Sequence, residues 1–174
     1  MRYFASLLAA GLLAELALLN GTIHAARAES NVTLSSVLGA ADWLNGHPTA
    51  QDVNGRVVLL DFYTFECFNC KNTEPNLRAL YKNVPRRDLV IISVHCPETP
   101  YEKSRAHLIA SLGEQGIAWP VAVDNEFRIW NAYGINAWPT QLIFDRRGTL
   151  RDTIVGDSQD AQVNATVGQL IKER

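Results

Sequence analysis

Residues 56–70 read RVVLLDFYTFECFNC, an apolar run that leads directly into two cysteines with the spacing C-x-x-C. The run from Arg56 to Tyr63 is rich in β-branched and aromatic residues and follows Asn54-Gly55, a typical turn pair. Its apolar side chains are continuous rather than alternating, which indicates a strand that is buried on both faces. We therefore expect a central strand of a sheet here.

A helix is expected directly after this strand. Beyond Cys67, the residues Leu77, Leu80 and Tyr81 repeat with helical spacing, and the pattern continues to about residue 83. Pro75 falls inside this segment, where its ring should kink the helix or reset its first turn. Strand, cysteine loop and helix therefore follow one another in order.

The rest of the chain alternates between further strand and helix patterns. We expect strands over 89–94, 121–123, 141–145 and 150–155, and helices over 34–44, 101–112, 126–133 and 159–171. The turn Arg146-Arg147-Gly148 should join the last two strands as a hairpin. Because strands and helices alternate, the order favours an α/β domain with parallel strands.

The composition is that of one compact domain. The chain has 174 residues, of which 47% are apolar and 20% are charged, and this apolar fraction is enough to fill a core. Its 16 Lys and Arg are scattered among 18 Asp and Glu, which gives a net charge of −2. Since the sequence contains no basic cluster, we expect no nucleic-acid partner.

The first residues have the pattern of a secretory signal peptide. A mostly apolar run over 3–14 follows a basic residue, and residues 26–28 (Ala-Arg-Ala) form a small-x-small cleavage site. Glu15 interrupts the apolar region, and its charge would be unfavourable in a full membrane span. An uncleaved membrane anchor is the alternative interpretation of this segment. We expect a signal peptide over 1–28, a single domain over 29–174, and export to the bacterial periplasm or cell envelope.

The position of the C-x-x-C pair between a strand and a helix has a chemical consequence. The first thiol faces the free N–H groups and the positive dipole end of the helix, which stabilise the thiolate that attacks disulfides. We therefore predict that Cys67 is the nucleophile and that Cys70, one turn later and facing inward, resolves the mixed disulfide. A structural disulfide and half of a zinc site are the alternatives. Lys71 rather than His follows the pair, so covalent haem attachment is not supported.

Other residues are candidates for supporting this chemistry. Asp61 is a carboxylate inside an apolar run, where burial is costly unless the group has a function, and accepting a proton from Cys70 is such a function. A cis bond at Trp138-Pro139, just before a strand, would expose backbone to an extended peptide. Phe68 is a large apolar side chain in an exposed loop. We predict that Trp138, Pro139 and Phe68 bind the substrate.

The sequence resembles the thioredoxin-like superfamily and, within it, the thiol–disulfide reductases of the bacterial cell envelope in the TlpA and DipZ group. The resemblance covers nearly all of residues 29–174. It rests on the cysteine pair, Trp138-Pro139 and the segments 40–45 (AADWLN), 57–64 (VVLLDFYT), 94–98 (VHCPE), 119–125 (WPVAVDN) and 133–134 (YG). It implies a thioredoxin-like fold with a central mixed β-sheet flanked by helices on both faces. It also implies an exposed Cys67, a buried Cys70, an acid at Asp61 and a cis Pro139 that faces the pair.

The residues around the cysteines depart from the superfamily pattern. Members commonly carry Trp before the first cysteine and Gly-Pro between the two, where this chain has Glu66 and then Phe68-Asn69. A carboxylate next to a thiolate opposes its ionisation. We therefore expect Glu66 to raise the pKa of Cys67 and to modulate the redox potential of the pair.

Three functions are compatible with these residues. The first is a protein thiol–disulfide oxidoreductase that reduces exported proteins, takes electrons from a membrane or soluble donor, and acts as a monomer without cofactor or metal. The second is a peroxiredoxin-like peroxidase, which Thr64-x-x-Cys67 suggests, although Leu60 stands where that family has proline. The third is a binding module with a static Cys67–Cys70 disulfide. Cys96 is expected to be a small buried or semi-exposed residue without a catalytic role.

Overall fold

The structure of the chain is a computed structural model that describes residues 32–173. The signal peptide or membrane anchor expected over 1–28 lies outside the described residues. Among the helices between residues 32 and 173, none is both long enough and apolar enough to cross a membrane.

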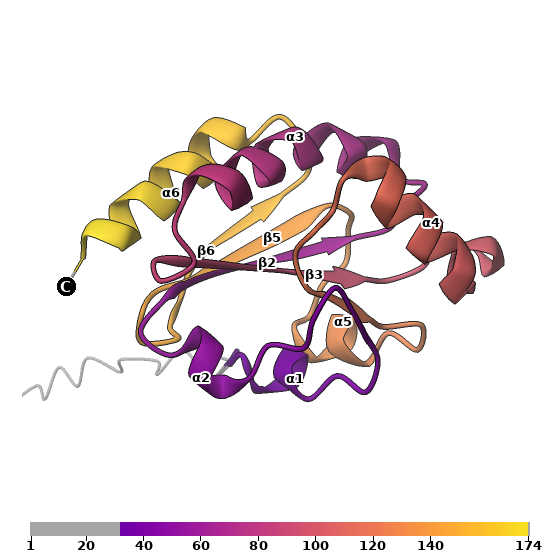
Figure 1. Ribbon diagram of the computed structural model, residues 1–174, viewed down its shortest axis with the longest axis horizontal. Helices are drawn as coiled ribbons and strands as arrows, with labels where there is room; N and C mark the ends of the chain where they lie inside the picture. The colour runs from indigo at the N-terminus through magenta and orange to yellow at the C-terminus, as the bar shows by residue number, and fades with distance from the viewer. Residues whose placement is uncertain (1–31, 174) are drawn as a thin grey trace, which may run out of the picture.

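One mixed sheet of six strands forms the centre of the molecule, in the order β1-β4-β3-β2-β5-β6 (Figure 1). Strands β2, β3 and β4 are parallel neighbours, whereas β1, β5 and β6 are each antiparallel to their neighbours β4, β2 and β5. The predicted α/β fold with a mixed sheet is therefore confirmed. The strands are β1 (Trp43–Leu44), β2 (Val57–Tyr63), β3 (Leu89–His95), β4 (Val121–Val123), β5 (Thr140–Phe144) and β6 (Leu150–Val155).

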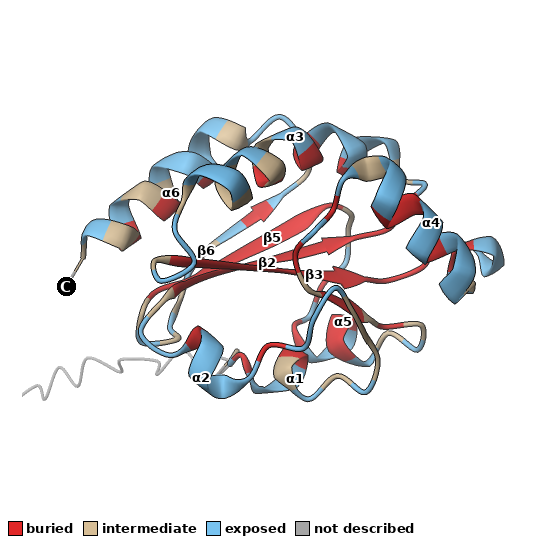
Figure 2. Cartoon of the chain, in the orientation of Figure 1, coloured by how far each residue is buried: buried red, intermediate tan, exposed pale blue. Residues whose placement is uncertain are grey.

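Helices cover both faces of this sheet. Helices α3, α4 and α6 pack on one face, and α1, α2 and α5 pack on the other (Figure 1). The buried sides of these helices turn toward the sheet and their exposed sides turn away from it (Figure 2). The helices are α1 (Ser35–Leu38), α2 (Ala50–Val53), α3 (Phe68–Asn83), the 3-10 helix η1 (Pro100–Lys103), α4 (Arg105–Gln115), α5 (Arg128–Ala132) and α6 (Asp160–Lys172).

Strand β2 lies in the middle of the sheet, as its apolar sequence predicts. All seven of its residues are buried, and so are all seven of β3. Side chains alternate between the two faces along a strand, so Leu59 and Tyr63 enter the core beneath α3 and α6, whereas Leu60 and Phe62 enter the core on the other face. The chain thus has two apolar layers, one on each face of the sheet, and β2 contributes side chains to both.

The predicted helix over 34–44 is wrong in its second half. Helix α1 ends at Leu38, with Gly39 as its C-cap. Trp43 and Leu44 form the short strand β1, which pairs with β4. A short apolar segment fits helical and strand spacing equally well, and here the hydrogen bonds to the edge of β4 favour the strand.

The predicted helix over 101–112 is divided in the structure into η1 and α4. Ser104 has extended backbone between them, and its side chain caps α4 by accepting a hydrogen bond from the backbone N–H of His107 (3.4 Å). Helix α2 has no counterpart in the prediction. It begins after Thr49, whose backbone N–H donates to the carboxylate of Asp52 (2.8 Å). The other predicted elements agree closely with the structure.

Phe62 tests how much one core layer contributes to stability. Its side chain is fully buried, and its ring centroid lies 5.5 Å from that of Tyr133 and 6.4 Å from that of Trp130. We predict that Phe62→Ala lowers the free energy of unfolding, measured by urea denaturation, by about 3–5 kcal/mol, because it removes buried area and leaves a cavity.

The control for this variant is Phe68→Ala. The Phe68 ring is 75% exposed, so its removal should change the free energy of unfolding by less than about 0.5 kcal/mol. Similar losses in the two variants would contradict the assignment of Phe62 to the core.

Candidate active site

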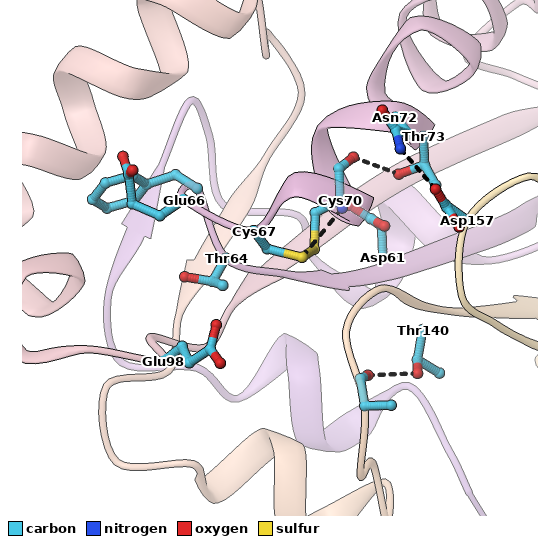
Figure 3. The surroundings of a disulfide bond; sticks show 12 residues. Asp61, Thr64, Glu66, Cys67, Cys70, Asn72, Thr73, Glu98, Thr140 and Asp157 are labelled. Atoms are coloured by element: carbon cyan, nitrogen blue, oxygen red, sulfur yellow. Dashed lines mark hydrogen bonds between the residues drawn. A yellow bond between two sulfur atoms is a disulfide. The ribbon is translucent and has the colours of Figure 1, made fainter.

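Cys67 and Cys70 are joined by a disulfide at the start of helix α3 (Figure 3). Their Cα atoms are 5.2 Å apart. Cys67 is the N-cap residue of α3, and its Sγ accepts a hydrogen bond from the backbone N–H of Cys70 (3.2 Å). The sulfur of Cys67 therefore faces the helix N-terminus, as predicted, where N–H groups and the helix dipole stabilise a thiolate after reduction.

The two cysteines differ in their access to solvent. Cys70 is 1% exposed, in agreement with the buried residue that the resemblance implied, whereas Cys67, for which it implied an exposed residue, is half-buried. The neighbours Glu66 and Phe68 are exposed on either side of Cys67. A partner can therefore reach the first sulfur but not the second. The modulation of the redox potential of the pair by Glu66 and the binding of substrate by Phe68 stay predictions.

Asp61 lies on β2, among the residues that surround the disulfide (Figure 3), and is only 3% exposed. Its carboxylate accepts hydrogen bonds from Ser93 Oγ (2.9 Å) and Gln141 Nε2 (3.4 Å). Ser93 is held in turn by the indole N–H of Trp119 (2.8 Å). Burial raises the pKa of Asp61 to about 6, although the two hydrogen bonds act to lower it. A carboxyl with this pKa can both accept and release a proton near neutral pH.

The partners of Asp61 were missed by the sequence analysis. Ser93 pairs with Asp61 across the parallel strands β2 and β3, and Gln141 pairs with it across the antiparallel strands β2 and β5. Each is a polar residue inside a buried strand. A polar residue in an apolar strand can be seen in the sequence. That Ser93 and Gln141 both lie beside Asp61 follows only when the strand order and register are known.

The peptide bond between Trp138 and Pro139 is cis, as the resemblance implied. The carbonyl of Pro139 accepts a hydrogen bond from the backbone N–H of Gly156 (2.8 Å), which ties this loop to the end of β6. Trp138 and Cys67 both pack, partly buried, against the core cluster beneath α3, and Thr140 lies below the disulfide (Figure 3). The loop is thus placed near the cysteine pair, and its role in binding substrate stays a prediction.

Glu102 holds the segment that precedes the first cysteine, a role that was not predicted from the sequence. It is 1% exposed. Its Oε1 accepts hydrogen bonds from the hydroxyl of Thr64 and from the backbone N–H of Glu66 (3.1 Å). Its Oε2 accepts from the backbone N–H groups of Glu98 (2.9 Å) and Thr99 (2.8 Å). The spacing Thr-x-x-Glu over residues 99–102, a capping-box pattern, is the signal that could have indicated it.

The remaining buried titratable groups near the site are not accessible to a partner. His95 is fully buried and stacks on Phe65 with ring centroids 5.4 Å apart, and burial lowers its pKa to about 4, so it is neutral at physiological pH. Cys96 is buried, its thiol lies 3.7 Å from the Asp124 carboxylate, and burial raises its pKa. Within residues 32–173 there is no group of three or more His, Cys, Asp or Glu placed to hold a metal ion.

A dithiol at the N-terminus of a helix that follows the central strand of a mixed sheet defines a thioredoxin-like domain. The fold is similar to that of a thiol-disulfide isomerase from Corynebacterium glutamicum, with a TM-score of 0.70 and 23% identity over 78% of this chain and 94% of that one. Residues 31–153 match the model of the AhpC/TSA family, and the chain belongs to that family.

Two relatives differ in how much of their own length is matched. Protein DipZ of Mycobacterium tuberculosis is 31% identical over 153 residues, which are 86% of this chain but 22% of DipZ. Thiol-disulfide oxidoreductase YkuV of Bacillus subtilis is 23% identical over 141 residues, which are 80% of this chain and 95% of YkuV. This chain therefore spans about a fifth of DipZ and nearly the whole of YkuV.

Asp61→Asn should change how stability depends on pH. The pKa of Asp61 is about 6 in the folded protein and 3.8 in the unfolded chain. Between these two pH values the folded protein binds more protons than the unfolded chain. The folded state therefore loses stability as the pH rises from 3.8 to 6. We predict that the variant lacks this loss and gains roughly 2 kcal/mol relative to wild type between pH 4 and pH 7.

Urea denaturation of the oxidised proteins at the two pH values measures this difference. Asp152→Asn is the control, because Asp152 is a partly exposed carboxylate of β6. If the difference between Asp61→Asn and wild type is the same at both pH values, Asp61 does not have a raised pKa.

Glu102→Gln should weaken the segment before the first cysteine. Burial alone would raise the pKa of Glu102, but hydrogen bonds from Thr64, Glu66 and Thr99 lower it below 4.5. The carboxylate therefore stabilises the folded state at neutral pH, and this contribution is lost as the pH falls through the lowered pKa. We predict that the variant loses about 1–3 kcal/mol of unfolding free energy at pH 7 and less at acid pH.

The matched control is Glu98→Gln, since the Glu98 side chain is exposed and only its backbone contacts Glu102. Chemical denaturation at several pH values compares the two variants. Equal stability of Glu102→Gln and Glu98→Gln at pH 7 would contradict the role given to Glu102.

Proposed function

We propose that this chain is a thiol–disulfide oxidoreductase that reduces disulfides of exported proteins with the Cys67–Cys70 dithiol. The observation that carries the proposal is the pairing of an accessible sulfur at the N-terminus of α3 with a buried one at a Cα separation of 5.2 Å. The buried acid Asp61 in the surroundings of the disulfide supports it.

The first step of the proposed reaction uses Cys67. Its thiolate attacks one sulfur of a client disulfide, a bond forms between Cys67 and that sulfur, and the other client sulfur leaves as a thiolate. The N–H groups at the start of α3 stabilise the attacking thiolate. Phe68 and the loop at Trp138 and Pro139 would hold the client chain beside Cys67.

The second step uses Cys70 and Asp61. The Cys70 thiol gives its proton to the Asp61 carboxylate, and its sulfur then attacks Cys67. The Cys67–Cys70 disulfide forms, the bond to the client breaks, and the client leaves as its second thiolate. The dithiol has then lost two electrons to the client, so a reducing donor must restore it before the next cycle.

Export and the identity of the partners belong to the proposal. The sequence pattern over 1–28 supports export to the periplasm or cell envelope, where a membrane or soluble donor would supply electrons. The near balance of acidic and basic residues supports protein clients rather than nucleic acid. We propose that the chain acts as a monomer.

The peroxidase alternative rests on the spacing Thr64-x-x-Cys67. Thr64 is fully buried, and its hydroxyl donates to the carboxylate of Glu102. Because this hydroxyl already donates to Glu102, it is not free to donate to a peroxide bound at Cys67. This observation favours the reductase. A static binding module would have no use for an acid of raised pKa next to its buried sulfur.

Three cysteine variants test the proposal in an insulin-reduction assay with a dithiol donor. We expect Cys67→Ser to lose all activity above the donor alone, because the attacking sulfur is gone. Cys70→Ser should accumulate mixed disulfides with client proteins on non-reducing gels. Cys96→Ser is the control and should keep wild-type activity, since that thiol is buried away from partners.

Two other outcomes would overturn the proposal. Rapid peroxide consumption by Cys70→Ser would favour the peroxidase, because peroxide reduction needs only the first cysteine. Absence of insulin reduction by the wild-type protein, together with failure to form mixed disulfides, would favour the binding module.

A further inference from the structure

Glu74 is an acid on the face of α3 that packs against the sheet. It follows Cys70 by four residues and precedes Leu77 by three, and side chains at these spacings lie on one side of a helix. All three are buried, with exposures of 1%, 6% and 1% for Cys70, Glu74 and Leu77. A carboxyl group therefore stands in an otherwise apolar row, one turn beyond the resolving cysteine.

One oxygen of Glu74 is paired and the other is not. Oε2 accepts a hydrogen bond from Arg78 Nη1 (3.2 Å). Oε1 is buried and has no hydrogen-bond partner among residues 32–173. The hydroxyl of Tyr63 is in the same condition, and Tyr63 follows Asp61 by two residues on β2, so that both side chains point to the α3 face of the sheet. Unpaired buried polar atoms are costly, which indicates a role beyond packing.

These groups are close enough to influence one another. Burial raises the pKa of Glu74, and the negative charge of Asp61 raises it further, whereas Arg78 and Lys71 lower it. The pKa of Tyr63 is raised by burial and by the charges of Asp61 and Glu74. Two buried carboxyls whose charges interact do not titrate independently.

Glu74 also borders an open surface pocket of about 500 Å³ between α3 and α4. The pocket wall includes Lys71 and Arg78 from α3 and Glu114 and Gln115 from α4. Glu114 is an exposed acid on the far wall. The carboxyl of Glu74 thus lies between the solvent and the buried surroundings of Asp61.

We propose that Glu74 is a positioning residue of the dithiol site whose charge sets the proton affinity of Asp61 and thereby the pH range in which Cys70 resolves the mixed disulfide. This inference rests on the proposed function. In the resolving step the proton of Cys70 moves to Asp61, and the Cys70 sulfur forms its bond to Cys67 as the client thiolate leaves. The negative charge of Glu74 favours the protonated form of Asp61, and the positive charge of Arg78 partly offsets the charge of Glu74.

The two acids and the groups around them come from five elements. They are Asp61 and Tyr63 of β2, Ser93 and the neutral His95 of β3, Gln141 of β5, and Lys71 and Arg78 of α3, with Glu114 of α4 across the pocket. Arg78 is the cation that is hydrogen-bonded to Glu74. Removing the charge of Glu74 should therefore lower the proton affinity of Asp61, and removing the charge of Arg78 should raise it.

The test follows the resolving step directly. Each reduced protein is mixed with the disulfide of thionitrobenzoate, which forms a mixed disulfide with Cys67, and the release of the second coloured thiol by Cys70 is timed from pH 4 to pH 9. The midpoint that depends on Asp61 is identified by its loss in Asp61→Asn. We expect Glu74→Gln to move this midpoint down by roughly one pH unit.

Further variants separate charge from packing. Arg78→Gln should move the midpoint upward, Glu74→Asp should restore it close to wild type, and Glu114→Gln should leave it unchanged because that acid is exposed to solvent. A loss of packing alone would change stability but not move the midpoint in opposite directions. If Glu74→Gln does not fold, the upward shift in Arg78→Gln still decides the question.

The inference and the proposed function fail in different ways. If the wild-type protein releases the second thiol with a midpoint that Glu74→Gln and Arg78→Gln do not move, the inference is wrong and the reductase stands. If the wild-type protein forms no mixed disulfide or never releases the second thiol, the reductase itself is wrong.

Discussion

The burial of strand β2 on both faces is the constraint on which the rest of the structure depends. Seven consecutive residues of this strand are removed from water, and this requires a helical layer on each side of the sheet. The same burial makes Asp61 a weak acid, because no solvent is available to stabilise its charge. The apolar sequence that forms the core thus also gives Asp61 the raised pKa that proton transfer near neutral pH requires.

The start of helix α3 converts this buried strand into a reactive site. The chain leaves β2, is held by Glu102, and enters the helix at Cys67, so that the first sulfur faces the helix N–H groups and the second belongs to a buried residue. Each sulfur therefore meets a different environment within a single turn of helix. This asymmetry allows one thiol to attack and the other to wait.

Much of this could be predicted from the sequence, and the failures have physical causes. The strand at 57–63 was evident from its continuous run of β-branched and aromatic residues after a turn pair, and the helix after Cys67 from its helical spacing. The short β1 at Trp43 was not, because an edge pairing depends on a partner distant in the chain. Ser93 and Glu102 were missed for the same reason, since each becomes part of the site only through a contact that strand register or loop packing creates.

The five hydrogen bonds that Glu102 accepts, two at Oε1 and three at Oε2, have a consequence for how the chain can vary. One carboxylate joins the loop before the first cysteine to the loop after β3. An insertion or deletion in the first loop would withdraw the donors of Oε1, and one in the second loop would withdraw those of Oε2, so either change leaves a buried carboxylate oxygen without its partners. The two loops are therefore expected to change length only together, so that a single side chain ties the evolution of two distant segments.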